Sequence, residues 1–319
     1  MSLEVLPSTA PGVSVVIPCY NAARYILATI RSVLAQEGVT LEVIVVDDGS
    51  SDGSADLVSR EFPQVIVLQQ PNQGVAAARN MGIARATLDW VAFVDADDIW
   101  LPGKLQAQWA LLRSHPQARM AYTAWQVWSS TEPEPPAAWL DGLASTTNDT
   151  SRWAGASGWI YPELLLDCVV WTSTVLVQRA LLQELGGFDT GLRIGEDYDL
   201  WLRISQITPI LRVPAPLALY RLHPQSLTRR VPERNYQGIV IANALRRCGY
   251  RSPDGRTADR RAVNRGLAKT WLDYGAAHLG AGNFALARDS ALRAIRLRPT
   301  DVGAWKVLTR AMAGAFRTR

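Results

Sequence analysis

The sequence predicts an α/β fold with a mostly parallel sheet and helices on both faces, followed by a small α-helical C-terminal region. Apolar runs rich in Val and Ile alternate with helical segments through the first hundred residues, which is typical of buried parallel strands. The chain beyond residue 231 shows helical periodicity alone. We therefore expect a flexible leader at 1–12, a large domain at 13–230 and a helical region at 231–319.

Composition narrows the class of protein. The 319 residues are 48% hydrophobic, which is enough for a packed core. The sequence lacks both an apolar run of about 18 residues and a basic leader followed by an apolar segment, so neither a membrane-spanning helix nor a secretory signal is expected. Cys19, Cys168 and Cys248 are scattered without metal-ligand spacing. They indicate reduced thiols of a cytoplasmic protein.

Charge is distributed unevenly along the chain. Residues 212–319 contain 21 Lys and Arg against 6 Asp and Glu, whereas residues 1–211 contain 12 against 23. A basic C-terminal third favours contact with an anionic membrane surface or an anionic acceptor. A solvated Arg-rich helical surface explains the same composition. No nucleic-acid-binding motif accompanies the charge, so no nucleic-acid partner is expected.

Strands and helices are expected to alternate through the first domain. The expected strands lie at 13–18, 41–46, 65–68, 90–94, 121–127, 169–177, 210–213 and 217–221. The expected helices lie at 26–34, 55–60, 75–86, 101–115 and 181–185, with another opening at the acidic cluster 195–199. Ligands of parallel sheets bind beyond the carboxyl ends of the strands. Residues 18–21, 47–50 and 95–98 are therefore expected along one edge.

Two other segments have patterns that predict a loop and a helical hairpin. Residues 129–158 are rich in Pro, Ser, Thr and Gly, which is typical of a long surface loop acting as a lid or binding loop. Residues 268–301 match a 34-residue tetratricopeptide-like helical hairpin, with Gly275 allowing close helix approach. One repeat does not bury its own face, so it should pack against helices near 236–248 and 302–316.

Three acids, Asp95, Asp97 and Asp98, follow the apolar strand at 90–94. An unpaired buried carboxylate costs several kcal/mol, so the cluster needs a cation, hydrogen-bond donors or open water. A metal ion holding a phosphate satisfies this need. A solvated turn with a helix N-cap is the alternative, and it applies first to Asp98.

Several short motifs occur in a specific order. They are Val15-Val16-Ile17-Pro18-Cys19-Tyr20-Asn21, Val45-Val46-Asp47-Asp48-Gly49-Ser50, Asn72-Gln73-Gly74 with Ala78-Arg79-Asn80, Asp95-Ala96-Asp97-Asp98, Gly187-Phe188-Asp189, Glu196-Asp197-Tyr198-Asp199-Leu200, and Arg221-Leu222-His223 with Ser226. In this order, over residues 13–230, the sequence resembles glycosyltransferase family 2, whose members have the nucleotide-diphosphosugar-binding GT-A fold. A dehydrogenase is not expected, because no Gly-x-Gly-x-x-Gly follows the first strand.

The resemblance implies a set of donor-binding residues. They are Pro18, Tyr20, Asn21, Asp47, Asp48, Gly74, Arg79, Asp95 and Ala96. Asp47, with Asp48 as a second candidate, would accept hydrogen bonds from the nucleotide base or ribose. Asp48 is alternatively a turn and helix cap. Arg79 would approach the sugar or diphosphate, and its alternative is a salt bridge on the helix surface.

The resemblance also implies a Mg²⁺ or Mn²⁺ site. Asp97 would be the direct ligand and Asp95 its partner, because these ions prefer oxygen ligands and bridge phosphates. His223 is a further candidate ligand, although a lone histidine is equally often structural. The metal would neutralise charge on the departing nucleoside diphosphate.

Catalysis is implied at the second acidic cluster. Asp197, with Glu196 as the fallback, would be the general base that deprotonates the acceptor hydroxyl, giving inversion at the anomeric carbon. A helix N-terminus, which favours acidic residues, is the alternative explanation of this cluster. Trp171 and Thr172 would line the acceptor side.

The function that follows is an inverting, metal-dependent glycosyltransferase of the hexosyltransferase type. Its expected donor is a nucleotide sugar, with a UDP-sugar as the first choice, and its acceptor is a glycan or a lipid-linked sugar in bacterial surface polysaccharide synthesis. A cytoplasmic protein that touches the inner face of the membrane is expected. The alternative is an interaction protein in which an inactive transferase domain supports a helical, partner-binding C-terminus.

Overall fold

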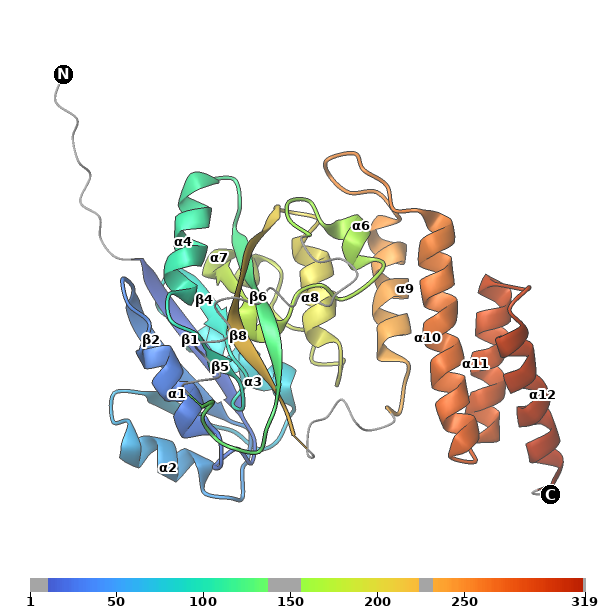
Figure 1. Cartoon of the computed structure of the whole chain (residues 1–319), viewed down its shortest axis with the longest axis horizontal. Coiled ribbons are helices and arrows are strands. Elements are labelled where there is room, and N and C mark those ends of the chain that lie inside the picture. The colour runs from blue at the N-terminus through green and yellow to red at the C-terminus, as the bar shows by residue number, and fades with distance from the viewer. Residues whose placement is uncertain (1–10, 137–155, 224–231, 318–319) are drawn as a thin grey trace. The chain divides into compact units, whose positions relative to one another are not determined.

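The computed structural model describes residues 11–136, 156–223 and 232–317. Two compact units are present (Figure 1). The first contains the chain up to Ile160 together with Val169–His223, and the second contains Tyr161–Cys168 together with the chain from Pro224 onward. Ser226 and most of the loop expected at 129–158 lie outside the described residues.

The first unit is built on an eight-stranded sheet with the order β3-β2-β1-β4-β7-β6-β8-β5. The strands are β1 (Gly12–Cys19), β2 (Thr40–Asp47), β3 (Ile66–Gln69), β4 (Trp90–Phe93), β5 (Ile99–Trp100), β6 (Met120–Ser129), β7 (Leu176–Gln178) and β8 (Ile210–Leu222). β1 pairs in parallel with β2 and β4, β2 pairs in parallel with β3, and β6 pairs in parallel with β8. β7 runs antiparallel to β4 and β6, and β5 runs antiparallel to β8. The predicted α/β class is confirmed, with a mixed sheet.

Helices cover both faces of this sheet (Figure 1). They are α1 (Ile26–Leu34), α2 (Ser54–Glu61), α3 (Val75–Arg85), α4 (Lys104–Ser114), α7 (Arg179–Glu184) and α8 (Glu196–Ile204). Side chains alternate between the two faces of a strand. Val15 of β1 packs in the core formed with α1, α2 and α4, whereas its neighbour Val16 faces α3 on the other side.

Glycine allows α3 to lie close to the sheet. A Cβ atom on Gly82 would come within 2.3 Å of Cγ1 of Val16, a separation that forces the helix outward. This close approach matters for the site, because Arg79 lies one turn earlier on the same helix.

Three expected strands differ from those observed. The strand expected at 169–177 is wrong over most of its length, because Thr172–Thr174 forms a 3₁₀ turn, η1, and only Leu176–Gln178 is a strand. Hydroxyl groups explain the turn, since Oγ1 of Thr174 donates to the carbonyl of Trp171 at 2.6 Å and so competes with strand pairing.

The strands expected at 210–213 and 217–221 are one strand, β8. It continues through Pro214 and Pro216, and its register with β6 shifts at this point. A bulge is the arrangement that admits proline into a paired strand, because the missing N–H is not needed there.

The second unit is helical. Its helices are α6 (Tyr161–Leu164), α9 (Tyr236–Cys248), α10 (Arg260–Gly280), α11 (Phe284–Leu297) and α12 (Val302–Arg317). The close approach predicted at Gly275 is confirmed, since a Cβ atom there would lie 3.0 Å from Cβ of Ser290 on α11. The assignment as a tetratricopeptide-like hairpin stays a prediction. Among the described residues, none of the helices is both long and apolar enough to span a bilayer.

Candidate active site

The ends of β1 and β2 meet at one edge of the sheet, as the sequence predicts. The backbone N–H of Asn21 donates to Oγ of Ser50 at 2.9 Å, and the backbone N–H of Ser51 donates to Oδ1 of Asn21 at 2.9 Å. Asn21 has a φ of 50°, a left-handed conformation that asparagine tolerates better than most residues. The loop after β4 lies beside them, because β4 pairs with β1 in parallel.

Asp47 and Asp48 have different surroundings. The carboxylate of Asp48 accepts hydrogen bonds from Nε2 of Gln70 and from the backbone N–H groups of Gln73 and Gly74, at 2.7–2.8 Å. Asp47 accepts one from the backbone N–H of Ser50 at 3.2 Å, and its Oδ1 is buried without a partner among the described residues. A buried acceptor without a donor is unfavourable, so Asp47 is the acid suited to accept from a ligand.

Three further residues predicted to bind the donor, Pro18, Tyr20 and Ala96, lie at the end of β1 or in the loop after β4. Pro18 is paired beside Val46 in the parallel ladder, and the side chain of Tyr20 is 55% exposed, which leaves its ring available to a ligand. The carbonyl of Ala96 accepts from Oγ1 of Thr29 at 2.9 Å, so Ala96 fixes the loop after β4 to α1.

The guanidinium of Arg79 joins the two acidic clusters. Its Nη2 lies 2.7 Å from Oδ1 of Asp95, and its Nη1 lies 2.6 Å from Oε1 of Glu196. The side chain is 4% exposed and lies over the ring of Phe188. Arg79 therefore forms a buried bridge between residues 101 positions apart in the sequence, and the contact with a sugar or diphosphate predicted for it stays a prediction.

Glu196 has an acidity unlike that of an ordinary glutamate. Burial raises its pKa from 4.5 to about 7, and the charge of Asp197 adds to the rise, while Arg79 opposes it. Glu196 therefore changes its protonation near neutral pH.

Asp197 is held by the turn predicted to line the acceptor side. Its Oδ2 accepts from Oγ1 of Thr172 at 2.7 Å, and its Oδ1 accepts from the backbone N–H of Tyr198 at 2.7 Å. It is half-buried, whereas Glu196 is buried. Both lie in the first turn of α8, where the helix dipole favours negative charge.

Trp171 is fixed at the start of that turn. Its Nε1 donates to Oδ2 of Asp98 at 3.2 Å, and its ring lies 4.0 Å, between centroids, from that of Tyr220.

Asp97 and His223 are adjacent, as the metal prediction requires. Nε2 of His223 lies 2.9 Å from Oδ2 of Asp97. Burial and the nearby charge of Asp95 raise the pKa of Asp97, whereas His223 opposes the rise. A cation at this carboxylate would relieve the same unfavourable charge.

The residues present fit a metal shared with a substrate. Asp95 is engaged by Arg79, and the described part of the chain contains no group of three His, Cys, Asp or Glu side chains arranged around one point. Mg²⁺ is commonly held by one or two carboxylates together with phosphate oxygens and water. Asp97 supplies one such carboxylate oxygen, and Nε2 of His223 lies beside it as a second candidate ligand atom.

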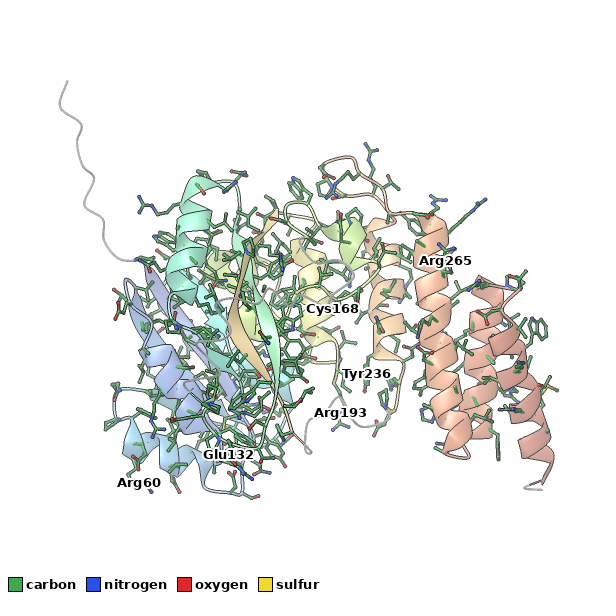
Figure 2. The ribbon with its side chains drawn as sticks, in the orientation of Figure 1. Arg60, Glu132, Cys168, Arg193, Tyr236 and Arg265 are labelled. Atoms are coloured by element: carbon green, nitrogen blue, oxygen red, sulfur yellow. The ribbon has the colours of Figure 1, made fainter. Side chains whose placement is uncertain are left out.

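Arg221 makes contacts that the sequence did not predict. Its Nε donates to the carbonyl of Asp97 at 2.7 Å and its Nη2 to the carbonyl of Pro133 at 2.8 Å, while Nη1 donates to the carbonyl of Glu132. Glu132 follows the end of β6 and is labelled in Figure 2. These acceptors are backbone atoms, so no side-chain pattern in the sequence indicates them.

Solved structures of similar architecture indicate the fold class. The structure resembles that of S. aureus TarS 1–349 in complex with UDP-GlcNAc, with a TM-score of 0.62 and 16% identity over 95% of this chain and 92% of that chain. It also resembles the mannosyltransferase PcManGT from Pyrobaculum calidifontis in complex with GDP-Man and Mn²⁺, with a TM-score of 0.57 and 21% identity over 99% and 90% of the two chains. At these identities the likeness shows the fold, which is GT-A-like.

The family follows from the sequence comparisons. Residues 14–142 match the model of Glycosyl transferase family 2. An uncharacterized glycosyltransferase of Rickettsia bellii is 28% identical over 72% of this chain, and the putative teichuronic acid biosynthesis glycosyltransferase TuaG of Bacillus subtilis is 44% identical over 31% of this chain and 40% of that protein. The comparisons support a glycosyltransferase family 2 domain at residues 14–142. The chain spans about a third of the length of the curated relatives from three Rickettsia species.

The raised pKa of Glu196 makes stability depend on pH. Because the folded state holds this proton more tightly than the unfolded state, the stabilisation is fully present below about pH 4.5 and is lost as pH rises through about 7. We expect the free energy of unfolding of the wild type, relative to Glu196→Gln, to fall by up to about 3 kcal/mol between about pH 5 and about pH 8. Urea denaturation at the two pH values measures this.

The exposed Glu61 of α2 provides the control, since Glu61→Gln should leave the pH dependence of the wild type unchanged. A difference between wild type and Glu196→Gln that is the same at both pH values would contradict the assignment.

Proposed function

We propose that this protein is an inverting, metal-dependent glycosyltransferase that moves a sugar from a nucleotide-diphosphosugar to a hydroxyl of a glycan or lipid-linked acceptor. The observation that carries the proposal is the bridge made by Arg79, which brings the loop of Asp95 and Asp97 to the helix end that carries Glu196 and Asp197. Donor-binding acids and a candidate base thereby lie at one edge of the sheet.

The nucleotide of the donor binds at the ends of β1 and β2 in this proposal. Asp47 accepts from the base or ribose through Oδ1, which has no partner among the described residues. The exposed ring of Tyr20 and the backbone near Pro18 form the other wall. Asp48 acts indirectly, by holding the 70–74 loop. A UDP-sugar is our first choice of donor. The structures similar to this one include complexes with UDP-GlcNAc and with GDP-Man.

Asp197 is the proposed general base. Its half-buried carboxylate takes the proton of the acceptor hydroxyl as that oxygen attacks the anomeric carbon. The bond from the anomeric carbon to the diphosphate oxygen breaks on the opposite side, so the configuration inverts. The hydrogen bond from Thr172 orients Oδ2 of Asp197, and Trp171 with Thr172 lines the acceptor side. Glu196 is the fallback base, because its pKa of about 7 suits proton transfer near neutral pH.

Asp97 and His223 are the residues that would hold Mg²⁺ or Mn²⁺, with Asp95 as the partner fixed by Arg79. A bound ion of this kind supplies Lewis-acid stabilisation of the departing diphosphate.

The pathway we propose is bacterial surface polysaccharide synthesis. The similarity to TuaG, whose name refers to teichuronic acid biosynthesis, supports it. Acidic glycans of this kind would also meet a basic C-terminal third.

Replacement of the base separates binding from transfer. We expect Asp197→Asn to bind the donor within about threefold of the wild type while transfer falls roughly 10²- to 10⁴-fold, because the proton acceptor is lost. Donor binding is measured by calorimetry. Transfer is measured as nucleoside diphosphate released from UDP-, GDP-, CDP- and dTDP-sugars with a panel of monosaccharide and lipid-linked acceptors.

The control is Asp89→Asn, an exposed acid at the amino end of β4, which should transfer normally. If Asp197→Asn transfers normally and Glu196→Gln does not, Glu196 is the base. A wild type that turns over none of the nucleotide sugars would refute the proposed function.

We also propose a cytoplasmic location with peripheral contact at the inner face of the membrane. α12 supports this contact, because its Val302, Trp305 and Met312 are 48–65% exposed. Lys306 and Arg310 are exposed beside them, and α12 contains no acid. Aromatic and aliphatic side chains flanked by basic ones suit the surface of an anionic bilayer.

The double variant Trp305→Glu with Met312→Glu tests the membrane contact. We expect it to bind vesicles containing phosphatidylglycerol roughly tenfold or more weakly than the wild type, because it loses apolar contact and gains repulsion. Co-sedimentation at low and high salt measures the binding. Ile207→Glu, at an exposed apolar residue of the first unit, is the control. Equal binding of the double variant and the wild type would rule out this face.

A further inference from the structure

Asp98 is a buried acid whose partners come from two separate segments. It lies between β4 and β5 and is 1% exposed, so it is not the helix cap that the sequence suggested; α4 begins at Lys104 after Gly103. Its Oδ2 accepts hydrogen bonds from Oγ of Ser173 and from Nε1 of Trp171, and its Oδ1 accepts from the backbone N–H of Arg221 at 3.0 Å.

One of these partners leads to the candidate base. Ser173 also accepts, through Oγ, a hydrogen bond from the backbone N–H of Asp95 at 3.0 Å. Its neighbour in η1, Thr172, donates to Oδ2 of Asp197 at 2.7 Å. The turn that orients Asp197 is therefore attached to the loop of Asp95 and Asp97 through Asp98 and Ser173.

The other oxygen leads to the candidate metal ligands. Arg221, whose backbone N–H bonds to Asp98, donates through Nε to the carbonyl of Asp97 at 2.7 Å. His223 follows two residues later and lies 2.9 Å from Oδ2 of Asp97. Asp98 thus attaches the end of β8 to the same loop.

The cost of burying Asp98 argues for a role beyond filling space. Its described contacts are with a hydroxyl, an indole N–H and a backbone N–H, and the guanidinium of Arg221 is directed to backbone carbonyls instead. A buried carboxylate without a close cation is expensive, and a well-packed apolar side chain in its place is often no less stable. An apolar side chain would not accept hydrogen bonds from two separate segments, as the carboxylate of Asp98 does.

We propose that Asp98 is a positioning residue that sets the donor loop, with Asp95 and Asp97, against the turn that orients Asp197. The inference rests on the proposed function. Without this link, η1 and the end of β8 still fold, but their distance from the loop is no longer fixed. A misplacement of about 1 Å between a base and the reacting atoms lowers the rate roughly 10²-fold.

Asp98→Asn tests the proposal, because the amide keeps the size of the side chain but replaces one acceptor oxygen by an N–H₂ donor. That donor would face either Ser173 and Trp171 or the backbone N–H of Arg221, which are themselves donors. We expect kcat to fall roughly 10- to 100-fold while the Kd for the donor stays within about threefold. Hydrogen exchange of the Thr172–Thr174 amides should become faster. The full chain is used with the nucleotide sugar that the wild type turns over fastest.

Two further variants complete the test. Leu112→Ala, at a residue of α4 in the hydrophobic core, should lower Tm and leave kcat and Kd unchanged. Ser173→Ala removes one donor to Asp98 and should lower kcat roughly 3- to 10-fold at unchanged Kd; it replaces Asp98→Asn if that variant does not fold.

The outcomes are distinct. The positioning role would be overturned if the wild type is active and Asp98→Asn changes only Tm, as Leu112→Ala does. The same outcome in Ser173→Ala counts if Asp98→Asn does not fold. Equal losses of donor affinity and kcat would overturn it too. A wild type without transfer would instead be a failure of the proposed function.

Discussion

The arrangement of the site depends on the buried guanidinium of Arg79. One cation lies between Asp95, in the loop after β4, and Glu196, in the first turn of α8. Without it two carboxylates would face each other in a place with little water, where like charges disfavour ionisation and unpaired charges are costly. Helix α3 positions the side chain of Arg79, and Gly82, one turn later, allows this helix to lie close to Val16. A packing detail of the core is thus linked to the electrostatics of the site.

The three acids after β4 make three different connections. Asp95 pairs with Arg79, Asp97 pairs with His223, and Asp98 accepts from Ser173, Trp171 and the backbone of Arg221. Each connection reaches a different segment, namely α3 with α8, the residue after β8, and the turn before β7. The cluster therefore serves as the junction at which the donor and acceptor sides of the proposed site meet. In the proposed function Asp47, whose Oδ1 has no partner within the described part of the chain, would complete the donor side at the end of β2.

Much of the first unit was predictable from the sequence, because each of its strands and helices is indicated by the residues of that segment alone. The apolar runs of β1, β2 and β4 and the polar residues that follow them indicate parallel strands with a ligand-binding edge. Contacts between distant residues were not predictable in the same way. The bond from Thr172 to Asp197 and the burial of Asp98 depend on how η1 packs, and the strand pattern at 169–177 hid that turn. β8 was divided in two because Pro214 and Pro216 normally end a strand, whereas a bulge admits them here.

In the proposed function, the residues after β4 hold a nucleoside diphosphate together with a divalent metal. Calorimetric titration of UDP and of GDP, with Mn²⁺ and with a chelator, tests it on the wild type, Asp97→Ala and the control Asp89→Ala at the opposite end of the same strand. We expect Mn²⁺-dependent binding of at least one nucleotide by the wild type and the control. We expect its loss in Asp97→Ala, because His223 alone of the two proposed ligands would remain. Equal affinities in Asp97→Ala and the wild type would contradict it, as would nucleotide binding by the wild type that is indifferent to the chelator.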